Sequence, residues 1–186
     1  MKRSVCVFAL VMLCMGFVVC AGNEDAFFKG DFYGVSWGMT KKEVMKAFAG
    51  DVIYENALAD KDVRYLYKER GEIVYVDFNF YNDEDSLESV EVKASTNGMW
   101  RTTCTLEYIA WHTNRLVQRF GSWKDKKISE FNYTDADTGV IEKGIGTSLG
   151  WDTPRMSVSA YISVSTNGTG NIGVSTSYYP RRRYLQ

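Results

Sequence analysis

The chain contains very little histidine and proline, and it has no excess of charge of either sign. Its 186 residues include one histidine and two prolines, with 22 basic and 23 acidic residues. A single histidine excludes a multi-histidine metal centre and leaves few routes to general acid–base catalysis. The balanced charge argues against a dedicated nucleic-acid binder. We therefore expect a non-enzymatic binding protein that uses no cofactor and has no nucleic-acid partner.

The N-terminus differs in composition from the rest of the chain. Lys2 and Arg3 precede an apolar run from Val5 to Ala21, and a polar, acidic stretch follows. This layout is typical of a secretory signal peptide, here residues 1–21. The apolar run is about seventeen residues, so an uncleaved membrane anchor is the alternative. The expected location is periplasmic or secreted.

Cys20 offers a second route, attachment of lipid to an exported chain. A bacterial lipobox favours a leucine-like residue three positions before the cysteine and a small residue directly before it, whereas this chain has Phe17 and Val19. We expect soluble export, with a membrane-anchored lipoprotein tethered through Cys20 as the alternative. Removal of the signal would leave Cys104 as the one cysteine, which excludes an internal disulfide.

A helix start is recognisable near residue 40. Thr40 is the expected N-cap and Glu43, three residues later, completes a capping box. Met39 and Val44 occupy the two positions of a hydrophobic staple, and Gly50 is expected to end the helix. After a polar loop, alternation with a period of two predicts strands near 63–68, 73–81 and 89–94, which form an antiparallel meander.

The second half repeats this order. An apolar stripe from Leu106 to Phe120 predicts a helix that ends at Gly121. Strands are expected at 146–152, 157–164 and 172–178, with residues 124–143 as a longer connection. The predicted fold class is α+β: two tandem units, 22–98 and 99–186, each a helix followed by a three-stranded antiparallel meander. The units are expected to pack as one domain with both helices on one face of the sheet.

The segment from Tyr33 to Val44, which contains Gly38-Met39-Thr40, resembles the start of the BamE/SmpA-type module. That family places a Gly-Met-Thr-x-x-x-Val helix start on a small α+β unit in exported bacterial lipoproteins. Two such units in tandem resemble the β-lactamase inhibitory protein architecture, whose fused sheets bind a partner protein. The resemblance implies an exported chain that binds another envelope or extracellular protein.

The candidate binding residues are the polar members of the alternating strands, which would face away from the helices. Tyrosine supplies contact area with little loss of conformational entropy, and serine adapts its hydrogen bonds, so both suit recognition. A half-exposed sheet that merely tolerates them is the alternative. The predicted protein-binding residues are Tyr75, Asp77, Tyr81, Ser159, Tyr161 and Tyr179.

Two alternative hypotheses, which include enzymatic activity, have less support in the sequence than protein binding. Cys104 and His112 resemble a nucleophile and a base, but eight residues of helix separate them by about 12 Å, too far for a working pair. A small-ligand or hydrolytic protein, with a pocket between helices and sheet and with Asp77 or Asp152 as an acid, is the competing hypothesis.

Overall fold

The computed structural model describes residues 31–48, 51–58, 62–80, 86–96, 102–134, 141–166 and 170–181. The expected signal peptide, Cys20 and Tyr81 lie outside these ranges. Among the residues described, no helix combines the length and the apolar character needed to span a membrane.

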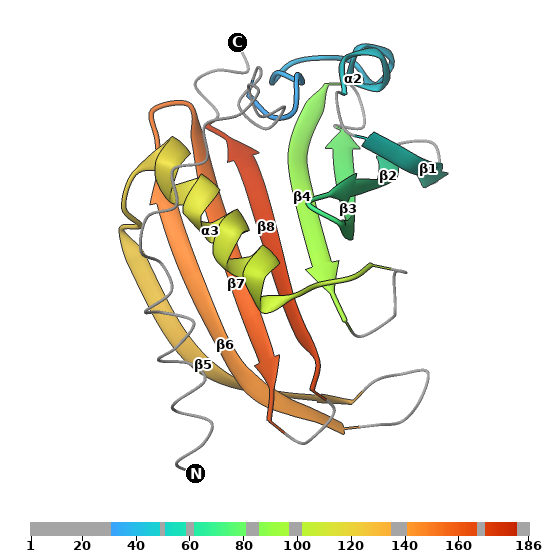
Figure 1. Ribbon diagram of the computed structural model, residues 1–186. Helices are drawn as coiled ribbons and strands as arrows, with labels where there is room; N and C mark the ends of the chain where they lie inside the picture. The colour runs from blue at the N-terminus through green and yellow to red at the C-terminus, as the bar shows by residue number, and fades with distance from the viewer. Residues whose placement is uncertain are drawn as a thin grey trace.

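The described ranges form two helices and eight strands (Figure 1). The helices are α2 (Lys41–Ala47) and α3 (Leu106–Phe120). The strands of the first half are β1 (Asp51–Leu58), β2 (Asp62–Glu69), β3 (Glu72–Phe80) and β4 (Leu87–Ser95). Those of the second half are β5 (Asp125–Thr134), β6 (Ile141–Asp152), β7 (Met156–Ser165) and β8 (Ile172–Pro180).

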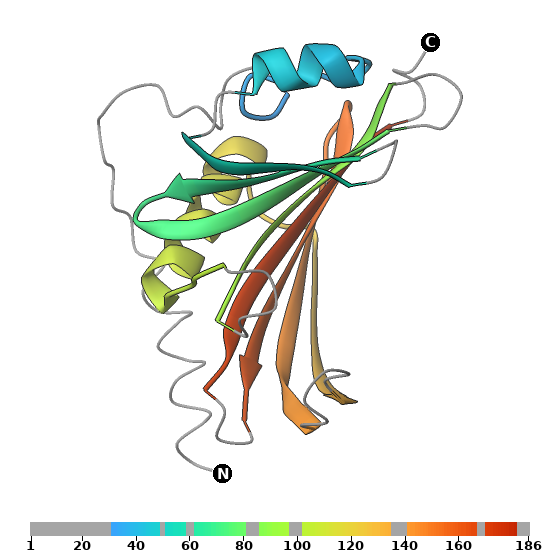
Figure 2. The same ribbon diagram turned by 90° about the vertical axis from the view of Figure 1, so that its right-hand side faces the viewer.

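All eight strands belong to one antiparallel sheet in the order β1-β2-β3-β4-β8-β7-β6-β5. The halves join where β4 pairs with β8, with Val90 opposite Tyr178 and Val92 opposite Thr176. The sheet twists strongly. In Figure 2, β1 to β3 run across the view, whereas β5 to β8 run down it. The expected pair of helix-plus-three-strand units is therefore wrong, and with it the α+β tandem repeat that the BamE-type resemblance implied.

The two strands that the sequence patterns missed, β1 and β5, are the two edges of this sheet. An edge strand buries less of its surface than a central strand, so its sequence does not need to alternate apolar with polar residues. In β5, Lys126, Ile128 and Glu130 point to one face and all three are exposed. The sequence therefore predicted a polar loop where β1 lies and a long connection where β5 lies.

The helix boundaries follow from local chemistry. The Thr40 side chain accepts from the Glu43 backbone and the Glu43 side chain accepts from the Thr40 backbone, so the predicted capping box is confirmed. Helix α3 ends before Gly121, as predicted, and this glycine has a φ of 79°, which L side chains rarely adopt.

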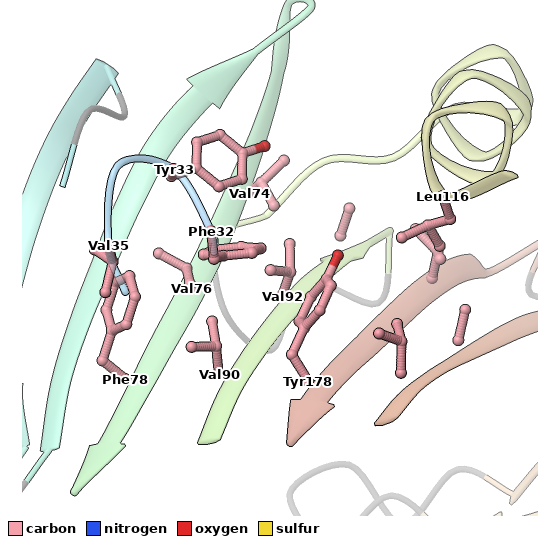
Figure 3. Packing of buried hydrophobic residues seen from close by; sticks show 14 of the residues in the cluster. Phe32, Tyr33, Val35, Val74, Val76, Phe78, Val90, Val92, Leu116 and Tyr178 are labelled. Carbon is pink, nitrogen blue, oxygen red and sulfur yellow. The ribbon is translucent and has the colours of Figure 1, made fainter. Parts of the chain in front are cut away.

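The hydrophobic core lies between the helices and one face of the sheet. Leu116 points from α3 toward the strands (Figure 3), and it is fully buried. Phe32, in the loop before α2, packs its ring 4.8 Å from that of Tyr178 on β8 and 6.2 Å from that of Phe78 on β3. Burial of each such side chain contributes about 1.5–3 kcal/mol, so this loop helps to hold the two halves together.

Candidate functional site

The opposite face of the sheet carries polar side chains, and we call it the outer face. Strand pairing places its residues in rows that cross both halves: Tyr75 faces Lys93, Lys93 faces Ser175, and Ser175 faces Tyr161. Side chains of both helices pack into the core on the other side. The outer face includes Arg64, Tyr75, Asp77, Glu91, Lys93, Ser157, Ser159, Tyr161, Ser163, Ser175, Ser177 and Tyr179.

A depression of about 150 Å³ lies on the outer face where β3, β4, β8 and β7 meet. It therefore spans the joint between the two halves. Its lining comprises Tyr75, Lys93, Ala94, Ser95, Thr102, Tyr161, Ser163, Gly173, Val174 and Ser175. Lys93 is the one charged residue of this lining, and most of the others offer hydroxyl groups. The depression is thus suited to hydrogen-bonding groups and to negative charge.

Tyr161 is positioned by a glycine on the neighbouring strand. Its ring lies over Gly146 of β6, where an added Cβ would come 2.0 Å from the Tyr161 hydroxyl oxygen. No side chain larger than that of glycine fits beneath the ring in this position. Burial raises the pKa of the Tyr161 phenol, so the hydroxyl stays protonated and is able to donate at neutral pH.

Tyr75 lines the depression from β3, and charged side chains hold it in place. The Arg64 guanidinium lies 4.6 Å from the centre of its ring, a cation–π contact. Arg64 also donates two hydrogen bonds of 2.5 Å to the Asp77 carboxylate, a bidentate pair. Tyr75 is 1% exposed, and burial raises the pKa of its phenol.

Lys93 brings a positive charge to the lining of the depression. Its ammonium lies 2.9 Å from the Glu91 carboxylate and 5.6 Å from the centre of the Tyr75 ring. Burial lowers the pKa of Lys93, but its interactions with Glu91 and Tyr75 outweigh burial and raise the pKa overall. Lys93 therefore stays charged at every physiological pH. Ser175 donates to the same Glu91 carboxylate at 3.2 Å, which ties β4 to β8.

The six predicted binding residues have different positions in the structure. Tyr161 lines the depression and is partly exposed. Tyr75 also lines it but is buried, and Asp77 is buried on the same strand as Tyr75. Ser159 is exposed beside it on β7, and Tyr179, 50% exposed, lies toward the end of β8. Tyr81 lies outside the described residues.

Sequence reasoning identified Asp77 but missed three other charged residues of this site. Arg64, Glu91 and Lys93 alternate with buried residues on β2 and β4, and this alternation was visible in the sequence. What the sequence did not contain was the cross-strand register, which brings Arg64 opposite Asp77 and Lys93 opposite Tyr75.

A second polar cluster lies in the core beneath α3, and we call it the Arg115 cluster. Arg115, 3% exposed, donates at 2.7 Å to both the Glu69 carboxylate and the Tyr33 hydroxyl. Tyr33 also donates to Glu69, and Tyr108 donates to its other oxygen at 2.7 Å. Burial, and then the Glu69 charge, raise the pKa of Tyr108 well above its usual value. These bonds attach α3 and the loop before α2 to β2.

Cys104 and His112 are both buried and do not form a pair of catalytic character. Burial, aided by the Glu72 charge, raises the pKa of the Cys104 thiol to about 12, so thiolate is scarce at neutral pH. Burial and the Arg115 charge lower the pKa of His112 to about 3. The His112 Nε2 atom lies 2.9 Å from the Thr176 hydroxyl. Among the described residues no three of His, Cys, Asp and Glu gather in a way that could hold a metal ion.

Comparison with protein-family models, with curated proteins and with solved structures finds no match for this chain. Function must therefore be argued from the outer face and its depression.

Proposed function

We propose that this chain is a binding protein that docks another protein on the outer face, with a side chain of the partner in the depression. The observation that carries the proposal is the depression itself. It lies on the face opposite the helices, at the joint of the two halves, and it combines Tyr161 with Lys93 and several hydroxyls.

The size of the depression favours a protein side chain over a free small ligand. Sites for drug-sized ligands have about 300–1,000 Å³ and enclose most of the molecule. The volume here is about 150 Å³, enough for one side chain. Lys93, as the charged residue of the lining, matches a carboxylate best, so the partner is expected to present an aspartate or glutamate at this point.

The competing hypothesis of a pocket between the helices and the sheet finds less support. That space is filled by side chains such as Ile109 and Leu116, which are at most 1% exposed. Asp77, one of the two proposed acids, accepts hydrogen bonds from two guanidinium nitrogens of Arg64 on the outer face.

The proposal is tested by site-specific photo-crosslinking of the full chain in its own cells. A benzophenone side chain at Ser159 samples the outer face, and one at Gln118 on α3, which is also exposed, is the matched control. We expect a discrete crosslinked species from Ser159 and none from Gln118. Crosslinking from Gln118 alone would show that the partner docks on the helix side.

Two substitutions then connect the crosslinked species to the depression. Tyr161→Ala and Lys93→Glu are each expected to reduce the yield from Ser159 at least tenfold, whereas Met45→Ala on α2 leaves it unchanged. A yield that survives both substitutions would remove the depression from the interface. If no protein is crosslinked but a small acid binds the purified chain and depends on Lys93, the small-ligand hypothesis replaces the proposal.

The location stays a prediction from residues 1–21 alone. We propose export in soluble form. The intact mass of the chain recovered from cells, with and without Cys20→Ser, separates signal removal from lipid attachment. Partition of the chain into detergent that is lost in Cys20→Ser would establish the lipoprotein alternative.

A further inference from the structure

Strand β5 is a long and regular edge of the sheet. It has ten residues, and β6 is its neighbour in the sheet order. It pairs with β6 from Asp125 to Thr134 without an irregularity, whereas β1, at the other edge, is interrupted between Val52 and Tyr54. A bulge blunts an edge against further pairing, and an unbroken edge offers backbone groups to another strand.

The exposed side chains of β5 have the order basic, apolar, acidic. Lys126, Ile128 and Glu130 share the face of the sheet that carries the core, since Lys126 pairs with Leu149 and Ile128 with Thr147. All three are exposed, and Ile128 at 57% is the most exposed large apolar side chain among the described residues. Lysine on an edge normally discourages pairing, unless the added strand brings an acidic residue opposite it.

The geometry of antiparallel pairing restricts how two copies of β5 are able to meet. Two residues directly opposite each other form either a hydrogen-bonded pair or a non-hydrogen-bonded pair. These two kinds of pair alternate along the strands, so a residue is never opposite the copy of its immediate neighbour. In a symmetric pair of identical strands, the two-fold axis must therefore pass between two copies of the same residue. An axis at Lys126, Lys127 or Glu130 would oppose like charges.

An axis at Ile128 gives a different outcome. It places Ile128 against its own copy, a β-branched pair, and it places Lys126 opposite Glu130 twice, once on each side of the axis. An axis at Ser129 or Phe131 opposes no lysine to a glutamate. We propose that the protein forms a two-fold symmetric dimer by antiparallel pairing of β5 with β5 of a second copy, centred on Ile128.

This pairing would continue the sheet across two molecules, and the outer faces of the two copies would lie side by side. The interface is one strand wide, which is small among specific interfaces, so the dimer is expected to be weak and dependent on concentration. The proposal does not depend on what docks on the outer face.

The test is sedimentation velocity of the full chain from low micromolar to near-millimolar concentration. We expect the weight-average mass to rise from one copy toward two. Lys126→Glu and Glu130→Lys each replace two attractive pairs by two repulsive ones, so each should weaken dimerisation by roughly tenfold or more. Circular dichroism of each variant checks that the fold is kept.

The decisive sample is an equimolar mixture of these two single variants. In the mixed dimer every position 126 again faces an opposite charge at position 130, so the mixture should dimerise although neither variant does so alone. Lys127→Glu, which would change a side chain opposite Ser129, is the matched control with little effect. A chain that stays monomeric throughout, a dimer indifferent to both substitutions, or a mixture that stays monomeric would each overturn the proposal.

Discussion

The protein holds an arginine–carboxylate pair on each face of the sheet, and the surroundings give them different roles. Arg115 and Glu69 lie in the core, and the side chain of each is at most 9% exposed. Arg64 and Asp77 lie on the outer face, where the Arg64 side chain retains 16% exposure. The inner pair is joined by two tyrosine hydroxyls, whereas the outer pair supports the ring of Tyr75. The same chemistry thus fixes a helix on one side and shapes a surface on the other.

The largest effect is expected when the inner pair is broken. Arg115→Met removes the cation and leaves the Glu69 carboxylate buried without its main partner. The free energy of unfolding should fall by about 3–5 kcal/mol, as measured by urea denaturation. Removing both partners should not restore stability, because Tyr33 and Tyr108 would lose their acceptor. A loss below about 1 kcal/mol would show that the Arg115 cluster is not structural.

The next largest effect is a dependence of stability on pH that is caused by His112, which is buried on the core side of the sheet. The pKa of His112 is about 3 in the fold and about 6.5 in the unfolded chain, so the unfolded chain binds the extra proton between these values. Stability should be fully present above pH 6.5 and fall by up to about 1.4 kcal/mol for each pH unit toward pH 3. In His112→Gln this part of the slope should vanish, and an unchanged slope would assign the dependence to other groups.

A smaller loss is expected on the outer side. Arg64→Ala leaves Asp77 able to reach water and removes the cation above Tyr75. The free energy of unfolding should fall by about 1–2 kcal/mol, clearly less than for Arg115→Met. Measurement of both variants in the same urea series tests the comparison, and equal losses would contradict it.

The smallest change in stability should accompany a large change in binding. Lys93 and Glu91 are each about one-third exposed, so Lys93→Ala should cost about 0–1 kcal/mol. Binding of the partner found by crosslinking should nevertheless weaken at least tenfold. A fold that is strongly destabilised by Lys93→Ala would assign this residue a structural role like that of Arg115.

How far the sequence predicted this fold depends on how much each segment buries. The capping box at Thr40, the helix before Gly121 and the central strands follow from local patterns, because burial on one face imposes alternation. The two-residue turn at Arg70 and Gly71, both at positive φ, was also visible as a break between strands. The edge strands β1 and β5 were missed because their sequences do not alternate apolar with polar residues.

The site was harder to predict than the strands. Alternation alone placed Tyr161 and Ser159 on the outer face of the sheet, but Tyr75 and Asp77 were expected to be exposed and are buried. Their burial results from Arg64 and Lys93 on neighbouring strands, and the sequence does not state which residues face each other across strands. The pairing of β4 with β8, which creates the depression, is a contact between residues far apart in the chain, and no local pattern specifies it.

That pairing also sets an order of events in folding. Strand β4 acquires its second neighbour only when β8 is available, and β8 lies beyond every other strand in the chain. Contacts between distant segments form slowly because closing the intervening loop costs entropy. During synthesis, the edge of β4 must therefore stay unpaired until the C-terminal strand emerges, and a chain that stalls before β8 exposes it to aggregation. The joint that the depression of the outer face spans is the last to close.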